Sequence, residues 1–226
     1  MVAWEDVTVY AKYEWRPFGV PWVHTIDDDL FARRMVVPDA NTLNWAPDEE
    51  RPERRLTLKD NAAETINTLG DAFWAAVTMA RESSLCARPF AHFFVRAFAS
   101  KGIDEFLAHM TVVEAALGSA LDHDRRSRPK FGRKDDPGAT DRVAWRVAGL
   151  LDDAVAGERY RELFKERSDF LHGRLMIRLP GQSRLDARRI ARRCIRALIE
   201  TARAAEDVTD PDAFLHKLLL RGQASS

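Results

Sequence analysis

Two residues of this chain, Arg167 and His172, carry side chains that suit chemistry on a phosphate group. A guanidinium has a permanent charge and a fork of donors that matches two phosphate oxygens, while an imidazole takes up and releases protons near neutral pH. Because a guanidinium cannot lose its charge, Arg167 needs an acceptor wherever it is buried. At 100° per residue it falls in the middle of an apolar stripe made of Tyr160, Leu163, Phe164, Phe170 and Leu171.

The spacing of these two residues decides how they could act together. On one ideal helix, a separation of five residues turns the two side chains roughly 140° apart. They meet only if the last turn unwinds at Gly173, or if two copies of the helix face each other and share the groups between chains. Ser168 and Asp169 lie one helical turn before His172, so we expect them to orient its imidazole.

A structural interpretation accounts for the same residues. In that case Arg167 closes an ion pair at the core, and His172 only ends the helix ahead of Gly173. Both interpretations need an acid, and the expected acid is Glu114, at the border of an apolar stripe over residues 103–121. The alternative for Glu114 is an ordinary surface position.

The sequence from Arg167 to His172, Arg-Ser-Asp-Phe-Leu-His, resembles the R-x4-H signature of HEPN domains. The glycine that follows, and an upstream helix ending Val-Val-Glu-Ala-Ala-Leu at residue 117, make it most similar to the Apea-like HEPN group. The resemblance covers roughly residues 66–206.

This resemblance implies a fold and an activity. It implies a dimer in which two R-x4-H motifs face each other and cleave RNA without a metal, leaving a 2′,3′-cyclic phosphate. Such enzymes are often toxins or phage-defence effectors. By resemblance, Arg167 and His172 would be catalytic, and Ser168 would be the polar residue after the arginine. The alternative is a HEPN-like module that has lost catalysis and serves in dimerisation or in nucleotide or RNA binding.

The residues themselves point to the same chemistry. Cleavage through the ribose 2′-OH needs a group that takes a proton, a group that gives one, and a cation for the charge on phosphorus. The motif holds one histidine per chain, so proton transfer at both ends requires a second copy. The six histidines and two cysteines show no metal-ligand spacing, so we expect neither a metal nor a cofactor. The expected partners are RNA, a second copy of the chain bound through the Arg167/His172 helix, and an antitoxin or defence partner.

The pattern along the chain predicts a mainly α fold, an antiparallel helical bundle over residues 62–226. It is preceded by an acidic, aromatic-rich arm, residues 1–61, with strands at residues 6–15 and 31–37. The aromatic side chains of the arm could stack on bases or anchor it to the helices.

Three helix starts are predicted: Thr140 as an N-cap, Ser183 to Asp186 as a capping box, and Asp210-Pro211 before the last helix. Gly157 is predicted to close the helix that begins at Thr140.

Arginines crowd the helix that follows the motif. They form a basic ridge whose interpretations are RNA binding or pairing with acids of neighbouring helices. The residues proposed for RNA contact are Arg174, Arg188, Arg189, Arg192 and Arg193.

Composition sets the outer limits. The formal net charge is +0, although residues 1–65 carry −5 and the rest of the chain +5, a tilt that permits a polyanion without demanding one. Only Cys86 and Cys194 are present, which indicates a reduced, cytoplasmic protein. The chain contains no stretch of 18 uncharged apolar residues, so no membrane span is predicted.

Overall fold

A computed structural model describes residues 3–4, 23–24, 26, 60–87, 89–100, 102–123, 136–173, 179–204 and 210–224. Within these ranges the chain is mainly helical, which confirms the predicted class. The chain divides into two units after Gly70, later than the predicted boundary after residue 61. The strands predicted at residues 6–15 and 31–37 lie outside the described residues.

In the first unit, Met1–Gly70, the described residues form a short antiparallel pair of strands and a helix. Strand β1 (Ala3–Trp4) pairs with β2 (Val23–His24). Helix α2 (Ala62–Asn67) begins where the 3.6-residue period begins. It ends at Asn67, before α3 (Asp71–Glu82) starts.

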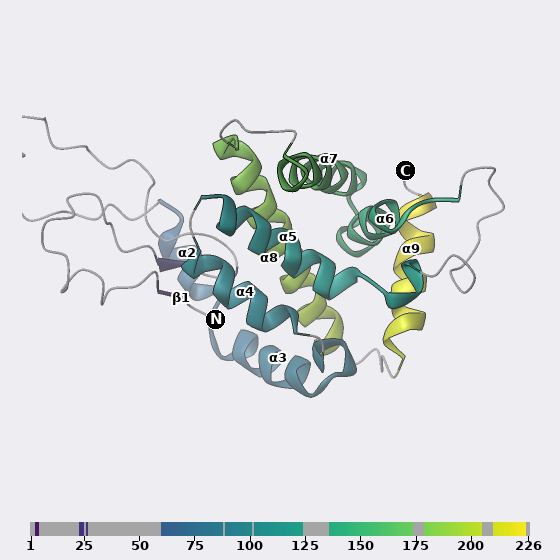
Figure 1. Ribbon diagram of the computed structural model, residues 1–226. Coiled ribbons are helices and arrows are strands. Elements are labelled where there is room, and N and C mark those ends of the chain that lie inside the picture. Colours follow the sequence, from purple (N-terminus) through teal and green to yellow (C-terminus); the bar gives the residue numbers. More distant parts are fainter. Residues whose placement is uncertain are drawn as a thin grey trace, which may run out of the picture. The chain divides into compact units, whose positions relative to one another are not determined.

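The second unit, Asp71–Ser226, is a helical assembly arranged around its longest described helix, α8 (Gly181–Arg203). Figure 1 shows α8 passing behind α5, and it packs against α3, α5, α6 and α7. Helix α4 packs on α5, and α9 packs on α6. The bounds of the other helices are α3 Asp71–Glu82, α4 Phe90–Ala99, α5 Ile103–Leu117, α6 Ala139–Leu151, α7 Ala154–Leu171 and α9 Pro211–Ala224.

The core of this unit follows the predicted stripes. Each helix contributes the apolar residues that recur every three or four positions, because that spacing places them on one face. The buried residues include Phe94, Phe98, Phe106, Met110, Val113, Leu117, Val143, Val147, Leu163, Ile190, Leu198, Leu215 and Leu219.

Glycines allow α6 to touch two of its neighbours. A Cβ atom on Gly222 of α9 would lie 1.8 Å from the carbonyl oxygen of Trp145, so only glycine fits this crossing. On the other side, a Cβ atom on Gly157 would lie 2.7 Å from the carbonyl oxygen of Ala144. Gly157 therefore lies inside α7 as a packing residue. The prediction that it closes the preceding helix, α6, is wrong. Helix α6 ends at Leu151.

A buried ion pair joins the segment after α5 to α6 and α9. The side chains of Arg146 and Asp122 are 4% and 1% exposed and hydrogen-bond to each other. Arg146 also donates to the carbonyl oxygens of Leu117 at 3.0 Å and Leu215 at 3.2 Å. Asp122 accepts from the backbone N–H of Ser119 at 3.1 Å. Because every group has several partners, the pair is stabilised despite its burial.

A membrane span requires a long and strongly apolar helix. Among the described residues, none of the helices meets that requirement.

Candidate functional site

The helix that carries the motif, α7, is fixed at its start by Asp153. One carboxylate oxygen of Asp153 accepts from the backbone N–H of Ala156 at 3.0 Å, as an N-cap does. The other accepts from Arg193 of α8 at 2.7 Å. The hydrogen bond from Arg193, together with that from Ala156, lowers the pKa of the Asp153 carboxyl. The start of α7 is thus tied to α8, which sets the direction of the helix.

The apolar stripe of α7 leaves the core as the helix approaches its C-terminus. Tyr160 and Leu163 are fully buried, Phe164 and Phe170 are half-buried, and Leu171 is 55% exposed. The predicted stripe is therefore a core face only over its first half. Its second half reaches the surface of this unit, at the level of the R-x4-H motif.

Arg167 lies where the stripe reaches the surface, and it meets the predicted acid. Its Nη1 atom is 3.1 Å from Oε1 of Glu114 on α5, and the two side chains are 24% and 28% exposed. The guanidinium carbon lies 5.3 Å from the centre of the Phe164 ring, an arrangement that favours a cation. The Nε atom of Arg167 is buried and has no hydrogen-bond partner among the described residues.

The surroundings of this pair alter two pKa values. Burial raises the pKa of the Glu114 carboxyl, and the charges of Arg167 and His123 offset this only in part. Burial also raises the pKa of the Tyr160 hydroxyl well above its usual value, and the nearby charge of Glu114 adds to the effect. The Tyr160 hydroxyl therefore keeps its proton near neutral pH and can donate it in a hydrogen bond.

His172 ends α7 and is exposed. The helix stays regular to Leu171, since the backbone N–H of His172 donates to the carbonyl oxygen of Ser168 at 3.0 Å. Gly173 follows with φ +68°, a conformation that favours glycine. Two arrangements were open for Arg167 and His172: unwinding of the last turn at Gly173, or a pairing between two copies of the helix. The last turn does not unwind, so within one chain the two side chains diverge. In the described part of the chain the imidazole forms no hydrogen bond, so the orienting role predicted for Ser168 and Asp169 is not seen.

The arginines of α8 divide into two groups, and two of the predicted RNA contacts are corrected. The side chains of Arg188 and Arg192 are buried, with their guanidinium carbons 5.9 and 5.1 Å from the centre of the Phe98 ring. Arg188 also hydrogen-bonds to the buried Glu105 of α5. These two residues are part of the helix packing and do not present their charge to an RNA.

Two other arginines of this helix remain at the surface. The side chain of Arg189 is 66% exposed and lies 3.3 Å from Asp186, and that of Arg193 is 42% exposed. Arg193 is already engaged with Asp153. Arg174 lies outside the described residues, so its predicted role is not placed.

Comparison of the chain with protein-family models, curated proteins and solved structures finds no match. The resemblance to HEPN domains therefore rests on the motif of α7, on Glu114 and on the helical pattern. The arrangement of those residues carries the functional argument.

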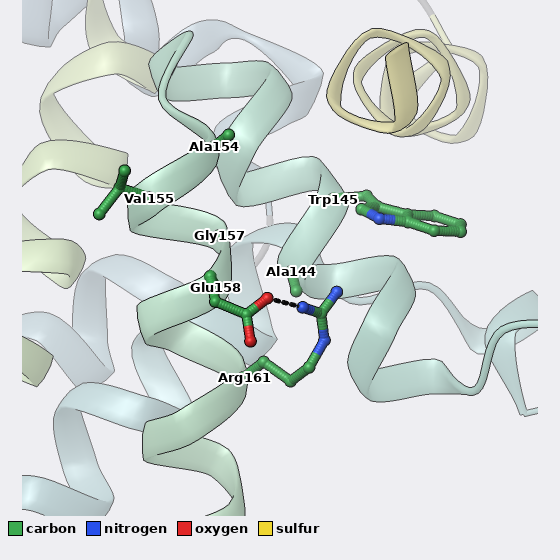
Figure 2. Close-up of a pocket in the computed structure, with 7 residues that line it drawn as sticks. All are labelled: Ala144, Trp145, Ala154, Val155, Gly157, Glu158 and Arg161. Carbon is green, nitrogen blue, oxygen red and sulfur yellow. Dashed lines mark hydrogen bonds and ion pairs between the residues drawn. The ribbon is translucent and has the colours of Figure 1, made fainter. Parts of the chain in front are cut away.

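A shallow hollow of about 270 Å³ lies on the first half of α7, against α6. Figure 2 shows Arg161 extending from α7 toward Ala144, with the carboxylate of Glu158 bound to its guanidinium. Arg161 also pairs with Asp141 at 2.8 Å. Six residues separate Arg161 from Arg167, which places the two on different sides of the helix. The hollow is therefore separate from the motif. Its lining consists of Ala144, Trp145, Ala154, Val155, Gly157, Glu158 and Arg161.

The sequence did not reveal two residues of the candidate site. The Phe164 ring lies under the Arg167 guanidinium, and the Tyr160 hydroxyl is buried where the Glu114 charge raises its pKa. The apolar stripe predicts only a packing role for both residues. A signal was present in the sequence, because a tyrosine seven residues before an arginine lies on the same helical face. A phenylalanine would fill the same space without placing a polar atom in the core.

Proposed function

We propose that this chain is a metal-independent endoribonuclease of HEPN type, acting on cytoplasmic RNA as a toxin or phage-defence effector. Arg167 holds the scissile phosphate, and the His172 imidazoles of two copies move the protons. One takes the proton of the ribose 2′-OH, and the other gives a proton to the leaving 5′-oxygen. Cleavage leaves a 2′,3′-cyclic phosphate. Ser168 and Asp169 border the site, and Arg189 of α8 contributes charge for the RNA backbone.

One observation carries the proposal. The guanidinium of Arg167 is held at the edge of the core, between Glu114 and the Phe164 ring, and remains 24% exposed. A guanidinium that served only the core would be expected to be buried and fully paired, as that of Arg146 is. Arg167 instead keeps an accessible surface on the same helix end as the exposed imidazole of His172.

The proposal includes a dimer. The side chains of Arg167 and His172 diverge on one regular helix, so a phosphate bound by one copy would receive the imidazole of the other. The half-buried Phe170 and the exposed Leu171 supply an apolar surface next to the motif. Light scattering at tens of micromolar tests this assembly, and a monomer would contradict it.

An inactive HEPN-like binding module is the second candidate. The contact between Arg167 and Glu114 favours it, because that contact neutralises the arginine within the chain. In such a module the ion pair would serve only stability, and His172 would only end the helix.

Cleavage of total RNA and tRNA in EDTA separates the two candidates. We expect wild type to cleave and to leave 2′,3′-cyclic ends, and His172→Ala to be inactive with an unchanged melting temperature, since its side chain is exposed. His92→Ala, at another exposed histidine, is the matched control and should cleave as wild type does. Full activity of His172→Ala, or activity abolished by EDTA, would end the proposal.

A further inference from the structure

The hydroxyl group of Tyr160 has no packing role that a phenylalanine ring would not fill. The residue is 0% exposed, and its oxygen has no hydrogen-bond partner among the described residues. A buried hydroxyl without a partner destabilises the fold, and native proteins keep few of them. Its retention at the centre of a helical unit needs a reason beyond packing.

The hydroxyl belongs to the same cluster as Arg167. The two residues are seven positions apart on α7, which places them on one face of the helix, about 20° apart. The Phe164 ring lies between them, with its centre 6.3 Å from that of the Tyr160 ring and 5.3 Å from the guanidinium carbon. Both charges act on the Tyr160 hydroxyl: that of Glu114 raises its pKa, and that of Arg167 lowers it.

Other groups that face the hydroxyl do not offer an anion. Cys194, from α8, is buried, and burial raises the pKa of its thiol to about 12, so it stays protonated near neutral pH. Glu114 is thus the anionic acceptor among the titratable groups that act on Tyr160.

Glu114 needs a donor whenever Arg167 leaves it. Among the described residues, the 3.1 Å bond from Arg167 is the one hydrogen bond that joins the carboxylate to α7, and the Glu114 side chain is 28% exposed. If the guanidinium turns from Glu114 to an RNA phosphate, it leaves behind a half-buried carboxylate that has lost this donor. A carboxylate in that position is costly unless another group donates to it.

We propose that Tyr160 is a positioning residue whose hydroxyl donates to Glu114 when Arg167 moves from Glu114 to the phosphate. Arg167 and Tyr160 are then alternative donors to one carboxylate, from the same face of α7. The exchange lowers the cost of releasing Arg167, so it favours RNA binding without adding to the stability of the free protein. This inference rests on the proposed ribonuclease function.

Tyr160→Phe tests the exchange because it removes only the hydroxyl. In a His172→Ala background, which prevents cleavage, binding of a single-stranded RNA oligomer is measured beside the melting temperature. We expect the melting temperature to be unchanged or higher, and the affinity to fall roughly tenfold or more, the value of a hydrogen bond to a charged group. With His172 restored, cleavage should fall by a similar factor. If the hydroxyl served only the fold, Tyr160→Phe would instead lower the melting temperature and the RNA affinity together.

Glu114→Ala supplies the control. Without the carboxylate the Tyr160 hydroxyl has no acceptor at this position, so adding Tyr160→Phe to Glu114→Ala should leave RNA affinity unchanged. Equal binding by Tyr160→Phe and its parent, an additional loss in the Glu114→Ala background, or a loss that follows a lower melting temperature would each overturn the inference while the ribonuclease assignment stands. If wild type neither binds nor cleaves RNA, the proposed function fails, and this inference fails with it.

Discussion

The guanidinium of Arg167 on α7 lies 3.1 Å from the carboxylate of Glu114 on α5, above the ring of Phe164. The contact joins the motif helix to a helix 53 residues earlier in the chain. Both side chains remain about one quarter exposed, so the pair is intermediate in burial between a surface ion pair and a buried one. An arginine in this position is anchored and yet able to reach a ligand.

Replacing Arg167 should therefore affect activity and stability together. We expect Arg167→Ala to abolish RNA cleavage and to lower the free energy of unfolding by about 1–2 kcal/mol, less than for a fully buried pair because solvent reaches Glu114. Arg167→Lys keeps the charge but loses the fork of donors, so it should be more stable than the alanine variant and remain nearly inactive. Urea unfolding and the cleavage assay measure the two effects.

Arg196→Ala is the control for these variants. Arg196 lies on the surface of α8, where it pairs with Glu200 one turn away. Its removal should change the free energy of unfolding by about 0.5 kcal/mol or less and leave cleavage intact. An Arg167→Ala variant that behaved like this control would show that the pair supports neither the fold nor the reaction.

The pH dependence of stability should report the burial of Glu114. Because its pKa is raised in the folded protein, the folded state binds the proton more tightly than the unfolded state does. Relative to Glu114→Gln, wild type should be most stable below the ordinary value of 4.5 and should lose stability as the pH rises through the raised pKa. Urea unfolding of both proteins from about pH 4 to about pH 8 measures the difference. A difference that stays constant, or grows in favour of wild type, would contradict the raised pKa.

The sequence predicted the Glu114–Arg167 contact because both residues lie at apolar stripes, where a charge needs a partner. It did not predict that Arg188 and Arg192 are buried. The helical pattern of α8 identifies one apolar face, Ile190, Cys194 and Leu198, and places the arginines on the other faces. The alternative that they pair with acids of neighbouring helices is confirmed for Arg188, which bonds to Glu105 of α5. In the structure, α8 is covered by four helices, so a second face is enclosed and its long side chains lie on the Phe98 ring. How many neighbours surround a helix is a tertiary property that its own periodicity does not contain.

Helix starts show a similar limit. The start of α9 after Asp210 is confirmed, and the Asp210 carboxylate accepts from the N–H of Ala213. The predicted start of α8 at Ser183 is wrong, since the helix begins at Gly181 and Ser183 is buried inside it. The carboxylate expected to complete the capping box, Asp186, instead accepts from Arg159 of α7 at 3.1 Å. Thr140 likewise lies inside α6, whose N-cap is Gly138. At Asp186, a partner on another helix thus takes up the carboxylate that the local pattern assigned to a cap.

The Arg146–Asp122 pair should be the most costly ion pair of the second unit to break. Asp122→Ala removes an acceptor that is 1% exposed. Among the described residues, the buried Arg146 charge then keeps only the backbone carbonyls of Leu117 and Leu215. We expect a loss of about 3–5 kcal/mol in the free energy of unfolding. Arg221→Ala, at an exposed pair with Asp152, is the control and should cost about 0.5 kcal/mol or less. Similar values for the two variants would mean that Asp122 is not needed to compensate Arg146.

A charge at the apolar C-terminal end of α7 should disrupt dimerisation without disrupting the fold. Leu171 is 55% exposed, so Leu171→Glu should leave the melting temperature within a few degrees of wild type. If two copies pair through this end of the helix, opposed glutamates would repel, and the dimer should dissociate at tens of micromolar in light scattering. RNA cleavage should fall with the dimer, because each phosphate would lose the imidazole of the second copy. Val155→Glu, at a 78% exposed position on the first turn of the same helix, adds the same charge away from the motif and should remain dimeric and active. Cleavage by a monomeric Leu171→Glu variant at the wild-type rate would show that one chain holds the whole site.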